Sequence, residues 1–186
     1  MRREIFGALV DSLASEEPVI LGRRRAAVAV VLSEKASPKL LLIRRSKRSG
    51  DPWSGQVAFP GGKFQEGDAS MRDTAVRETL EETGVDLAAS SDFLGYAGKF
   101  GTHTGEMEVV TAVFLLKEEV QVKTNEEAES HMWAGLSEML SPGARSTYEV
   151  RREEGAQMVP AFRVGDYVVW GLTRRIILAL VGEDSA

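Results

Sequence analysis

The sequence contains no cysteine. This absence excludes disulfide bonds, thiolate metal ligands and a cysteine nucleophile, and it fits an intracellular protein. No apolar run approaches the about 20 residues that cross a bilayer, since the longest, Ala26 to Leu32, has the length of a strand. No signal peptide is visible, because Met1 to Arg3 lead into a short segment that contains acidic residues. We therefore expect a cytoplasmic protein that has no membrane partner.

The chain also lacks an excess of basic residues. Its formal net charge is −5 at pH 7, so we do not expect non-specific binding to nucleic acid. Internal repeats and low-complexity segments are absent as well. What remains is a chain of 186 residues, 43% hydrophobic and 27% charged, which is the composition of an ordinary globular protein. This length fits one domain, and we predict a single domain over residues 1–186.

Short apolar segments separated by turn residues predict an α/β protein. Residues 1–22 are typical of a short amphipathic helix followed by a linker, and residues 171–182 of a closing helix. Between them we predict strands at 26–33, 39–44, 56–59, 93–100, 107–116, 148–152, 158–162 and 167–170. A turn that begins at Glu153 and Glu154 separates two of these strands.

One stretch, Gly61 to Val85, combines a glycine turn, an acidic loop and a charged helix. Ser70 is a suitable N-cap for this helix, with Asp73 three residues later, and Gly84 suits the left-handed residue that ends it. At about 100° per residue, one face of the helix carries four charged residues, Arg77, Glu78, Glu81 and Glu82. The opposite face, which we expect to be the packed one, carries Ala75, Val76, Thr79, Leu80 and Thr83.

Three carboxylates on one helical face repel one another unless a partner neutralises them. Mg²⁺ prefers oxygen ligands and is typically held by a few carboxylates together with substrate phosphates. Glu78 and Glu82 are one turn apart, and Arg77 precedes Glu81 by four residues, which is the spacing that lets it orient that side chain. From the residues alone, a metal site and an ordinary solvated charged face both remain open.

The order of residues in this stretch resembles the Nudix box, the signature of the Nudix hydrolase family. The second half of that signature is an Arg-Glu-apolar-x-Glu-Glu-x-Gly-apolar run, which corresponds here to RETLEETGV at 77–85. Thr79 stands where an apolar residue is usual. Gly62 lies one residue farther from the arginine than is common, so the loop acid of the family corresponds to Glu66 or Asp68.

The preceding segment resembles the extended signature of the coenzyme A diphosphatase branch of the same family. Arg45-Ser46, Gly55 and the Phe-Pro-Gly-Gly run at 59–62 match that signature. The interval between Arg45 and Gly55 is one residue longer than usual, and Asp51-Pro52-Trp53 is an insertion. Ile43 also stands where threonine is common.

The resemblance implies the Nudix fold, in which a mixed β-sheet lies in an α/β/α sandwich. It implies a metal-dependent hydrolase with Mg²⁺ or Mn²⁺ as its cofactor. Glu78 and Glu82 would be the principal metal ligands, and Glu81 a further ligand or a nearby base. Arg77 would orient these carboxylates without binding phosphate itself.

The family also places an acidic loop before a tryptophan-bearing strand and a short helix, which corresponds here to the region from Asn125 to Leu140. In the family, a carboxylate from this region often serves as a further metal ligand or as the general base. The candidates are Glu127 and Glu129, with Glu126 behind them.

The implied substrate is a small nucleotide-type molecule with a diphosphate bond. The basic loop that contains Lys47 offers a phosphate pocket, since arginine and lysine both bind phosphate, and an ordinary solvated loop is the alternative that remains open. The substrate-binding candidates are Arg44, Arg45, Arg48, Gly61 and Gly62. Dimers are common in the family, and a homodimer through the amino-terminal helix is the assembly that we consider.

The first hypothesis for the substrate is coenzyme A or acyl-coenzyme A, cleaved to 3′,5′-ADP and a phosphopantetheine product. ADP-ribose, dinucleoside polyphosphates and nucleoside triphosphates are alternatives that use the same chemistry. A Nudix-fold module that senses a nucleotide without cleaving it is an alternative of another class. An isopentenyl diphosphate isomerase is rejected, because that related family relies on a cysteine.

Overall fold

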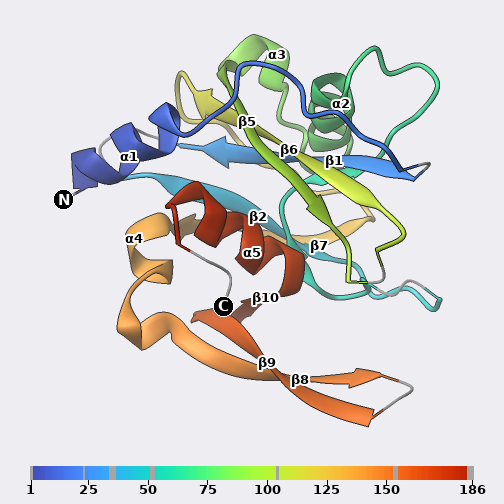
Figure 1. Ribbon diagram of the computed structural model, residues 1–186, viewed down its shortest axis with the longest axis vertical. Coiled ribbons are helices and arrows are strands. Elements are labelled where there is room, and N and C mark those ends of the chain that lie inside the picture. Colours follow the sequence, from blue (N-terminus) through green and yellow to red (C-terminus); the bar gives the residue numbers. More distant parts are fainter. Residues whose placement is uncertain are drawn as a thin grey trace.

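The structure, a computed structural model, describes residues 2–22, 24–33, 37–50, 53–103, 105–152 and 155–183. One mixed sheet contains β1 (Arg25–Leu32), β2 (Lys39–Arg45), β3 (Val57–Ala58), β4 (Gly61–Lys63), β5 (Ser91–Gly101), β6 (Glu108–Leu116) and β7 (Ala128–Gly135). A second sheet contains β8 (Arg145–Arg152), β9 (Gly155–Val164) and β10 (Tyr167–Trp170). The helices are α1 (Arg2–Asp11), α2 (Met71–Thr83), α3 (Leu87–Ser90), α4 (Leu136–Met139), the 3₁₀ helix η1 (Pro142–Ala144) and α5 (Gly171–Leu180) (Figure 1).

Strand β1 is the centre of the larger sheet. It runs parallel to β6 over its whole length, whereas its other partners are antiparallel. The edge of β1 away from β6 is shared by two strands, because Leu32 pairs with Leu40 of β2 while Ala26 to Val28 pair with β4. This shared edge brings the glycine turn that begins at Gly61 onto the middle of the sheet, next to α2.

The larger sheet has an apolar core on each face. Val30 and Leu32 point to the core that includes α1, α5 and the second sheet. Ala29 and Val31 point to the other core, which lies under α2 and α3. The alternation follows the two-residue period of a strand, and it makes the run at β1 apolar throughout because both faces are covered. The predicted α/β/α arrangement of a mixed sheet is confirmed (Figure 1).

The predicted strands and the closing helix are present within a few residues of the expected ranges. The sequence did not indicate that β8, β9 and β10 separate from the main sheet, with β8 and β9 extending from the body of the molecule (Figure 1). The predicted turn at Glu153 and Glu154 and the insertion residues Asp51 and Pro52 lie outside the described residues. In the described part of the chain, no helix is both long and apolar enough to cross a membrane.

The segment after α1, predicted as a linker, is fixed to the larger sheet. Ala14 exchanges two backbone hydrogen bonds with Tyr96 of β5, at N···O distances of 2.9 and 2.8 Å. The carboxylate of Glu17 accepts from the backbone N–H of Met71 at 2.9 Å and from the Tyr96 hydroxyl at 3.1 Å. Since Met71 is the first residue of α2, this carboxylate satisfies a free N–H at the start of that helix.

Candidate active site

Helix α2 begins and ends where its sequence predicts. The Ser70 hydroxyl accepts a hydrogen bond from the backbone N–H of Asp73 at 3.1 Å. Gly84 adopts the left-handed conformation, with φ of 69°, and its N–H donates to the Leu80 carbonyl. Both caps are therefore confirmed, and they fix the length of the helix that carries the acidic residues.

The packed face of α2 differs from the prediction. Leu80, expected to be packed, is 47% exposed, whereas Glu78 and Glu82 are only 9% and 1% exposed. The buried residues are Met71, Thr74, Ala75, Glu78, Thr79, Glu82 and Thr83, which form one stripe at helical spacing. The stripe faces β1 and β4, and the two carboxylates are buried because the glycines of β4 leave room beside them.

Glu82 lies closest to the backbone of the glycine turn. One of its carboxylate oxygens accepts from the Gly61 N–H at 2.9 Å, and the other lies 3.7 Å from a guanidinium nitrogen of Arg45. Burial raises the pKa of the Glu82 carboxyl to about 7, and the two donors only partly oppose this effect. A cation that reached this carboxylate would therefore stabilise its charged form.

Glu78 packs against the next glycine of the turn. A Cβ added to Gly62 would overlap the Glu78 carboxyl group, so only glycine leaves space for this side chain as it lies here. Burial raises the pKa of Glu78, and Arg77, which donates to it at 2.8 Å, acts in the opposite direction. Gly61 and Gly62 thus each contact one of the two buried carboxylates.

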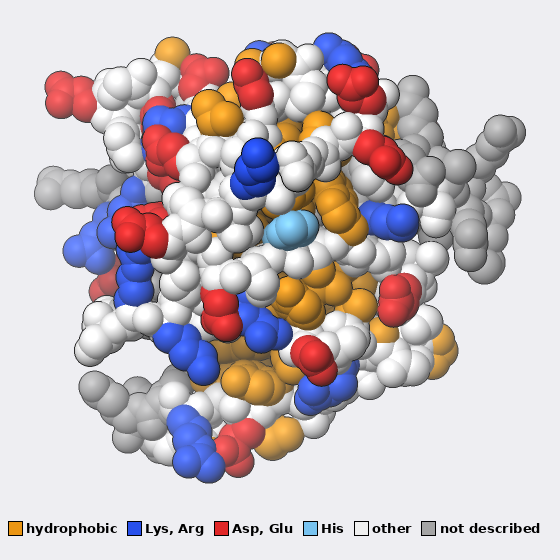
Figure 2. Space-filling view, turned by 180° about the vertical axis from the view of Figure 1, so that it is seen from behind, with side chains coloured by type: hydrophobic (Ala, Val, Ile, Leu, Met, Phe, Trp, Pro, Cys, Tyr) orange, Lys and Arg blue, Asp and Glu red, His pale blue; other side chains and the backbone are white. Residues whose placement is uncertain are grey.

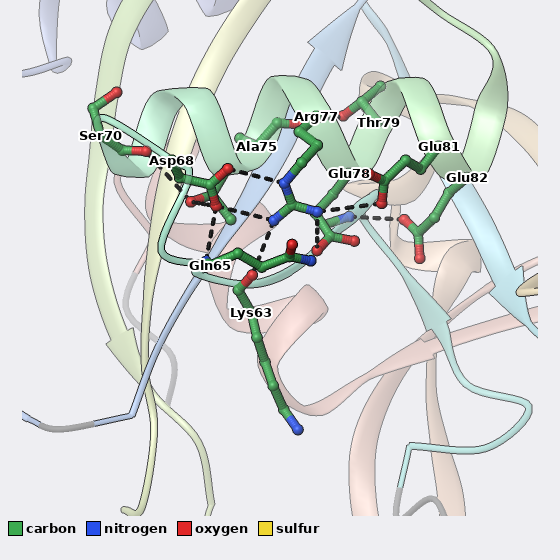
Figure 3. A network of polar contacts seen from close by, with 12 residues as sticks. Lys63, Gln65, Asp68, Ser70, Ala75, Arg77, Glu78, Thr79, Glu81 and Glu82 are labelled. Carbon is green, nitrogen blue, oxygen red and sulfur yellow. Dashed lines mark hydrogen bonds and ion pairs between the residues drawn. The ribbon is translucent and has the colours of Figure 1, made fainter.

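Arg77 joins the loop before α2 to the acidic face of the helix (Figure 3). Its guanidinium donates to both carboxylate oxygens of Asp68, at 2.9 and 3.0 Å, and to the Lys63 carbonyl at 3.1 Å. It also donates to Glu78 and, at 3.2 Å, to Glu81. The hydrogen bonds from Arg77 hold the pKa of Asp68 well below its usual range. Of the two loop acids that the sequence left open, Asp68 is therefore the one that anchors this arginine.

Thr79, a departure from the family pattern, is compatible with its buried position. Its hydroxyl donates to the Ala75 carbonyl one turn earlier, at 2.7 Å. The polar group is thus satisfied within the helix, and its methyl group packs as an apolar side chain would.

A third carboxylate reaches the same region from a distant part of the chain. The charge of Glu127 contributes to the raised pKa of both Glu78 and Glu82, so it lies within electrostatic range of each. Glu81 is exposed and is held by Arg77. Glu129, the other candidate from this region, is exposed on β7, and its side chain makes no polar contact among the described residues.

Asn125 places the loop that carries Glu127, and the sequence did not single out its role. Its side-chain nitrogen donates to the Glu81 carbonyl at 2.8 Å, and its side-chain oxygen accepts from the Glu127 N–H at 2.8 Å. The second contact is the local turn that asparagine makes with the residue two positions later. The Asn-Glu-Glu order was the available signal for that turn, but the first contact depends on tertiary structure.

The three arginines predicted to bind substrate do not converge on one pocket. Arg48 pairs with Glu127 at 3.2 Å, and Arg45 lies near Glu82, so both are beside the acidic residues. Arg44 faces elsewhere, with its guanidinium over the Tyr167 ring and a hydrogen bond of 2.8 Å to the carbonyl that precedes this tyrosine. The structure therefore does not bring these arginines together into the expected phosphate pocket.

The side chains at this site suit a hard divalent cation. Among the described residues, no three acidic or histidine side chains converge closely enough to form a complete metal cage. Magnesium rarely requires one, because it is usually held by one or two carboxylates and completed by substrate phosphates and water. The adjacent buried carboxylates of Glu78 and Glu82 match that pattern, and the nearby Glu127 adds a third negative charge.

The surface seen from behind carries charges of both signs (Figure 2). Lys and Arg side chains gather toward the left of this face but alternate with acidic ones, and apolar side chains surround a single histidine near the middle. The residues described on this face form no continuous basic surface of the kind that holds a nucleic acid backbone.

A family model, the NUDIX domain, matches residues 22–153 of this chain. The chain belongs to the Nudix hydrolase family. The protein is therefore an enzyme that acts on pyrophosphate bonds of nucleoside diphosphate-linked substrates, and members of this family generally use divalent metal ions. The match covers the acidic residues of this site, from Asp68 to Glu129.

Relatives support the same assignment. An uncharacterized Nudix hydrolase, NudL, from Citrobacter koseri is 34% identical over 161 residues, covering 86% of this chain and 82% of the relative. A NudL protein from Yersinia pestis is 32% identical over 163 residues, covering 87% and 80%. A solved structure of a MutT/nudix family protein from Enterococcus faecalis has the same fold, with a TM-score of 0.58 at 21% identity, covering 89% of this chain and 63% of the other.

Proposed function

We propose that this Nudix hydrolase cleaves the diphosphate of coenzyme A or acyl-coenzyme A to 3′,5′-ADP and the corresponding phosphopantetheine. The catalytic part of the proposal rests on one observation, the burial of Glu78 and Glu82 against the backbone of Gly61 and Gly62. A cation stabilises the charged form of carboxylates buried at this spacing, and a diphosphate substrate brings the remaining oxygen ligands. The choice of coenzyme A rests on the resemblance of the segment at 40–62 to the signature of the coenzyme A diphosphatase branch.

Glu78 and Glu82 would hold the divalent cation, with the exposed Glu81 as a further ligand. When bound, such a cation supplies charge neutralisation of the diphosphate and a lower pKa for an attacking water. Arg77 is a positioning residue in this scheme, because its donors are engaged by Asp68, Glu78 and other protein oxygens. It sets the orientation of the ligands without touching phosphate.

Glu127 is the residue we assign as general base. A carboxylate oxygen of this side chain would accept the proton of the attacking water, while Arg48 fixes the carboxylate through its contact of 3.2 Å. Glu129 was an equal candidate from the sequence, but it makes no described contact with this region. It therefore provides a matched control, since Glu127→Gln and Glu129→Gln make the same chemical change two residues apart. We expect Glu127→Gln to lower kcat by at least about 100-fold and Glu129→Gln to have little effect.

The test of the proposed function is a product screen with Mg²⁺ in ¹⁸O-labelled water. The panel contains coenzyme A, ADP-ribose, a dinucleoside polyphosphate and nucleoside triphosphates, with Glu82→Gln as the inactive control. Release of 3′,5′-ADP from coenzyme A by the wild type alone is the expected result, and the labelled product identifies the attacked phosphorus. Cleavage of another panel member in its place would retain the chemistry and reject coenzyme A. Binding of a nucleotide without cleavage would instead indicate a sensor.

A further inference from the structure

A cavity of about 770 Å³ opens beside the glycine turn, on residues that the sequence did not single out as binding residues. Its walls include Arg24 and Arg25 at the start of β1, Lys63 and Phe64 after the turn, Trp53 and Glu106. This volume lies within the range of sites that hold a small molecule, about 300–1,000 Å³. The cavity combines two aromatic rings with three basic side chains and two acidic ones, Glu66 and Glu106.

The cavity adjoins the proposed catalytic carboxylates through β4. Lys63 directly follows Gly62, the residue in contact with the Glu78 carboxylate. The Lys63 carbonyl also accepts from Arg77 at 3.1 Å. A ligand held in the cavity would reach Glu78 past the short strand β4, since the Lys63 side chain and the Gly62 position turned toward Glu78 lie on opposite sides of that strand.

The basic side chains of the cavity differ in how firmly the protein engages them. The Lys63 ammonium extends away from the Arg77 network (Figure 3), and in the described part of the chain it has no ion-pair partner. Arg24 pairs with Glu106 at 3.2 Å, but both side chains are about two-thirds exposed, at 69% and 65%, so this pair is weak. Lys63 and Arg24 are therefore available to a ligand anion.

The aromatic side chains supply a different kind of contact. The Arg25 guanidinium lies 3.7 Å from the centre of the Phe64 ring and covers one side of it. Trp53 is 38% exposed at the cavity wall, where a flat heterocycle can stack on an indole. Glu106, once released by Arg24, can accept a hydrogen bond from a base amino group or a ribose hydroxyl. Together these groups match a nucleoside that carries a phosphate.

We propose that this cavity binds the nucleoside end of the substrate and that Lys63, with Arg24, binds a phosphomonoester on its ribose. The inference rests on the proposed function and deepens it, since coenzyme A carries a 3′-phosphate whereas ADP-ribose does not. It assigns recognition of that phosphate to Lys63 and Arg24, in place of the loop arginines Arg44, Arg45 and Arg48. Lys63 is a specificity-determining residue in this assignment, and it has no role in the hydrolytic step.

Binding without turnover tests the cavity directly. Calorimetric titration of the full chain should show 3′,5′-ADP binding about tenfold more tightly than 5′-AMP, because only the first carries the ribose phosphate. Lys63→Met should reduce this preference to near unity while leaving 5′-AMP binding unchanged. Lys117→Met, which removes an exposed lysine paired with Asp92, should retain the wild-type preference. Trp53→Leu should weaken both nucleotides alike, by at least about fivefold.

Hydrolysis provides the second readout. The wild type should show a higher kcat/KM for coenzyme A than for dephospho-coenzyme A, and Lys63→Met should remove the difference without lowering kcat for dephospho-coenzyme A. If coenzyme A is cleaved but Lys63→Met retains the full preference in both assays, the cavity assignment is wrong and the proposed function stands. If neither compound is cleaved but the nucleotides bind as expected, the proposed substrate is wrong and the cavity assignment stands. If Arg48→Met loses the preference for 3′,5′-ADP and Lys63→Met keeps it, the loop arginines bind the ribose phosphate and the assignment to Lys63 is wrong.

Discussion

Gly62 lies directly against the carboxylate of Glu78, in a space that a single methyl group would fill. Gly62→Ala should therefore leave the fold intact, because the overlapping atoms belong to the end of a flexible side chain. The carboxylate must move, and displacement of a catalytic group by about 1 Å costs about 100-fold in rate. We expect kcat/KM to fall by about this factor on the substrate found in the product screen, with an unchanged circular dichroism spectrum.

The control for this substitution is Gly67→Ala, in the same loop. A Cβ at Gly67 meets no atom within 4 Å, so this variant should retain wild-type activity. Equal activity of Gly62→Ala and the wild type would show that the position of Glu78 does not limit the reaction.

The pair formed by Asp68 and Arg77 should contribute to stability as well as to the orientation of Glu78. Asp68→Asn weakens two charge-assisted hydrogen bonds at a side chain that is only 6% exposed, so we expect a loss of about 2 kcal/mol in the free energy of unfolding. Arg77 lowers the pKa of Asp68, so this contribution is present above about pH 4 and is lost as the pH falls further. Urea denaturation at pH 7 and at pH 3 measures both effects.

Glu66→Gln is the matched control for that measurement, because Glu66 is an exposed acid in the same loop. It should leave the urea midpoint unchanged at both pH values. If Asp68→Asn and Glu66→Gln behave alike at pH 7, the contacts of Asp68 with Arg77 do not stabilise the protein.

In the absence of metal, the buried Glu82 carboxylate should lower the free energy of unfolding. Burial raises its pKa to about 7, so at pH 8 the folded state holds a buried charge that the unfolded state exposes to water. Gln at this position keeps an oxygen to accept from the Gly61 N–H and carries no charge. In the presence of a chelator at pH 8 we expect Glu82→Gln to be more stable than the wild type, by about 2 kcal/mol.

Addition of Mg²⁺ should reverse this order by stabilising the wild type and not Glu82→Gln, because ligand binding to the folded state raises its stability. Thermal melts with and without Mg²⁺ measure both effects. A variant less stable than the wild type in chelator would contradict the prediction, and so would equal stabilisation of the two proteins by Mg²⁺.

Tyr96 should give the protein a specific sensitivity to high pH. Burial, together with the carboxylate of Glu17, raises the pKa of Tyr96 to about 12. The hydroxyl in the unfolded chain titrates near 10, so the stability from this group is complete below about pH 10 and is lost as the pH rises toward 12. The difference in unfolding free energy between the wild type and Tyr96→Phe should therefore shrink across this range. A constant difference from pH 9 to 12 would reject the assignment.

The features of the fold that could be predicted from the sequence are those that depend on neighbouring residues. Ser70 and Gly84 bound α2 because capping depends on neighbouring residues alone. The apolar run of β1 indicated a strand buried on both faces, as observed. By contrast, the packed face of α2 was assigned to the apolar side, and Leu80 proved exposed while Glu78 and Glu82 were buried. Hydrophobicity predicts which face packs only when no functional group must be buried.

The sequence by itself indicated the family, the helix α2 and the acidic pair Glu78 and Glu82, because these lie in one continuous stretch with fixed spacing. Tertiary structure alone decided the rest of the site. It brings Glu127 into electrostatic range of this pair, since only contacts between distant segments fix a loop relative to a helix. It also separated Arg44 from Arg45 and Arg48, because neighbouring residues on a strand point to opposite sides and spacing does not reveal their partners. The cavity beside Lys63 forms from the ends of three strands that the sequence keeps far apart.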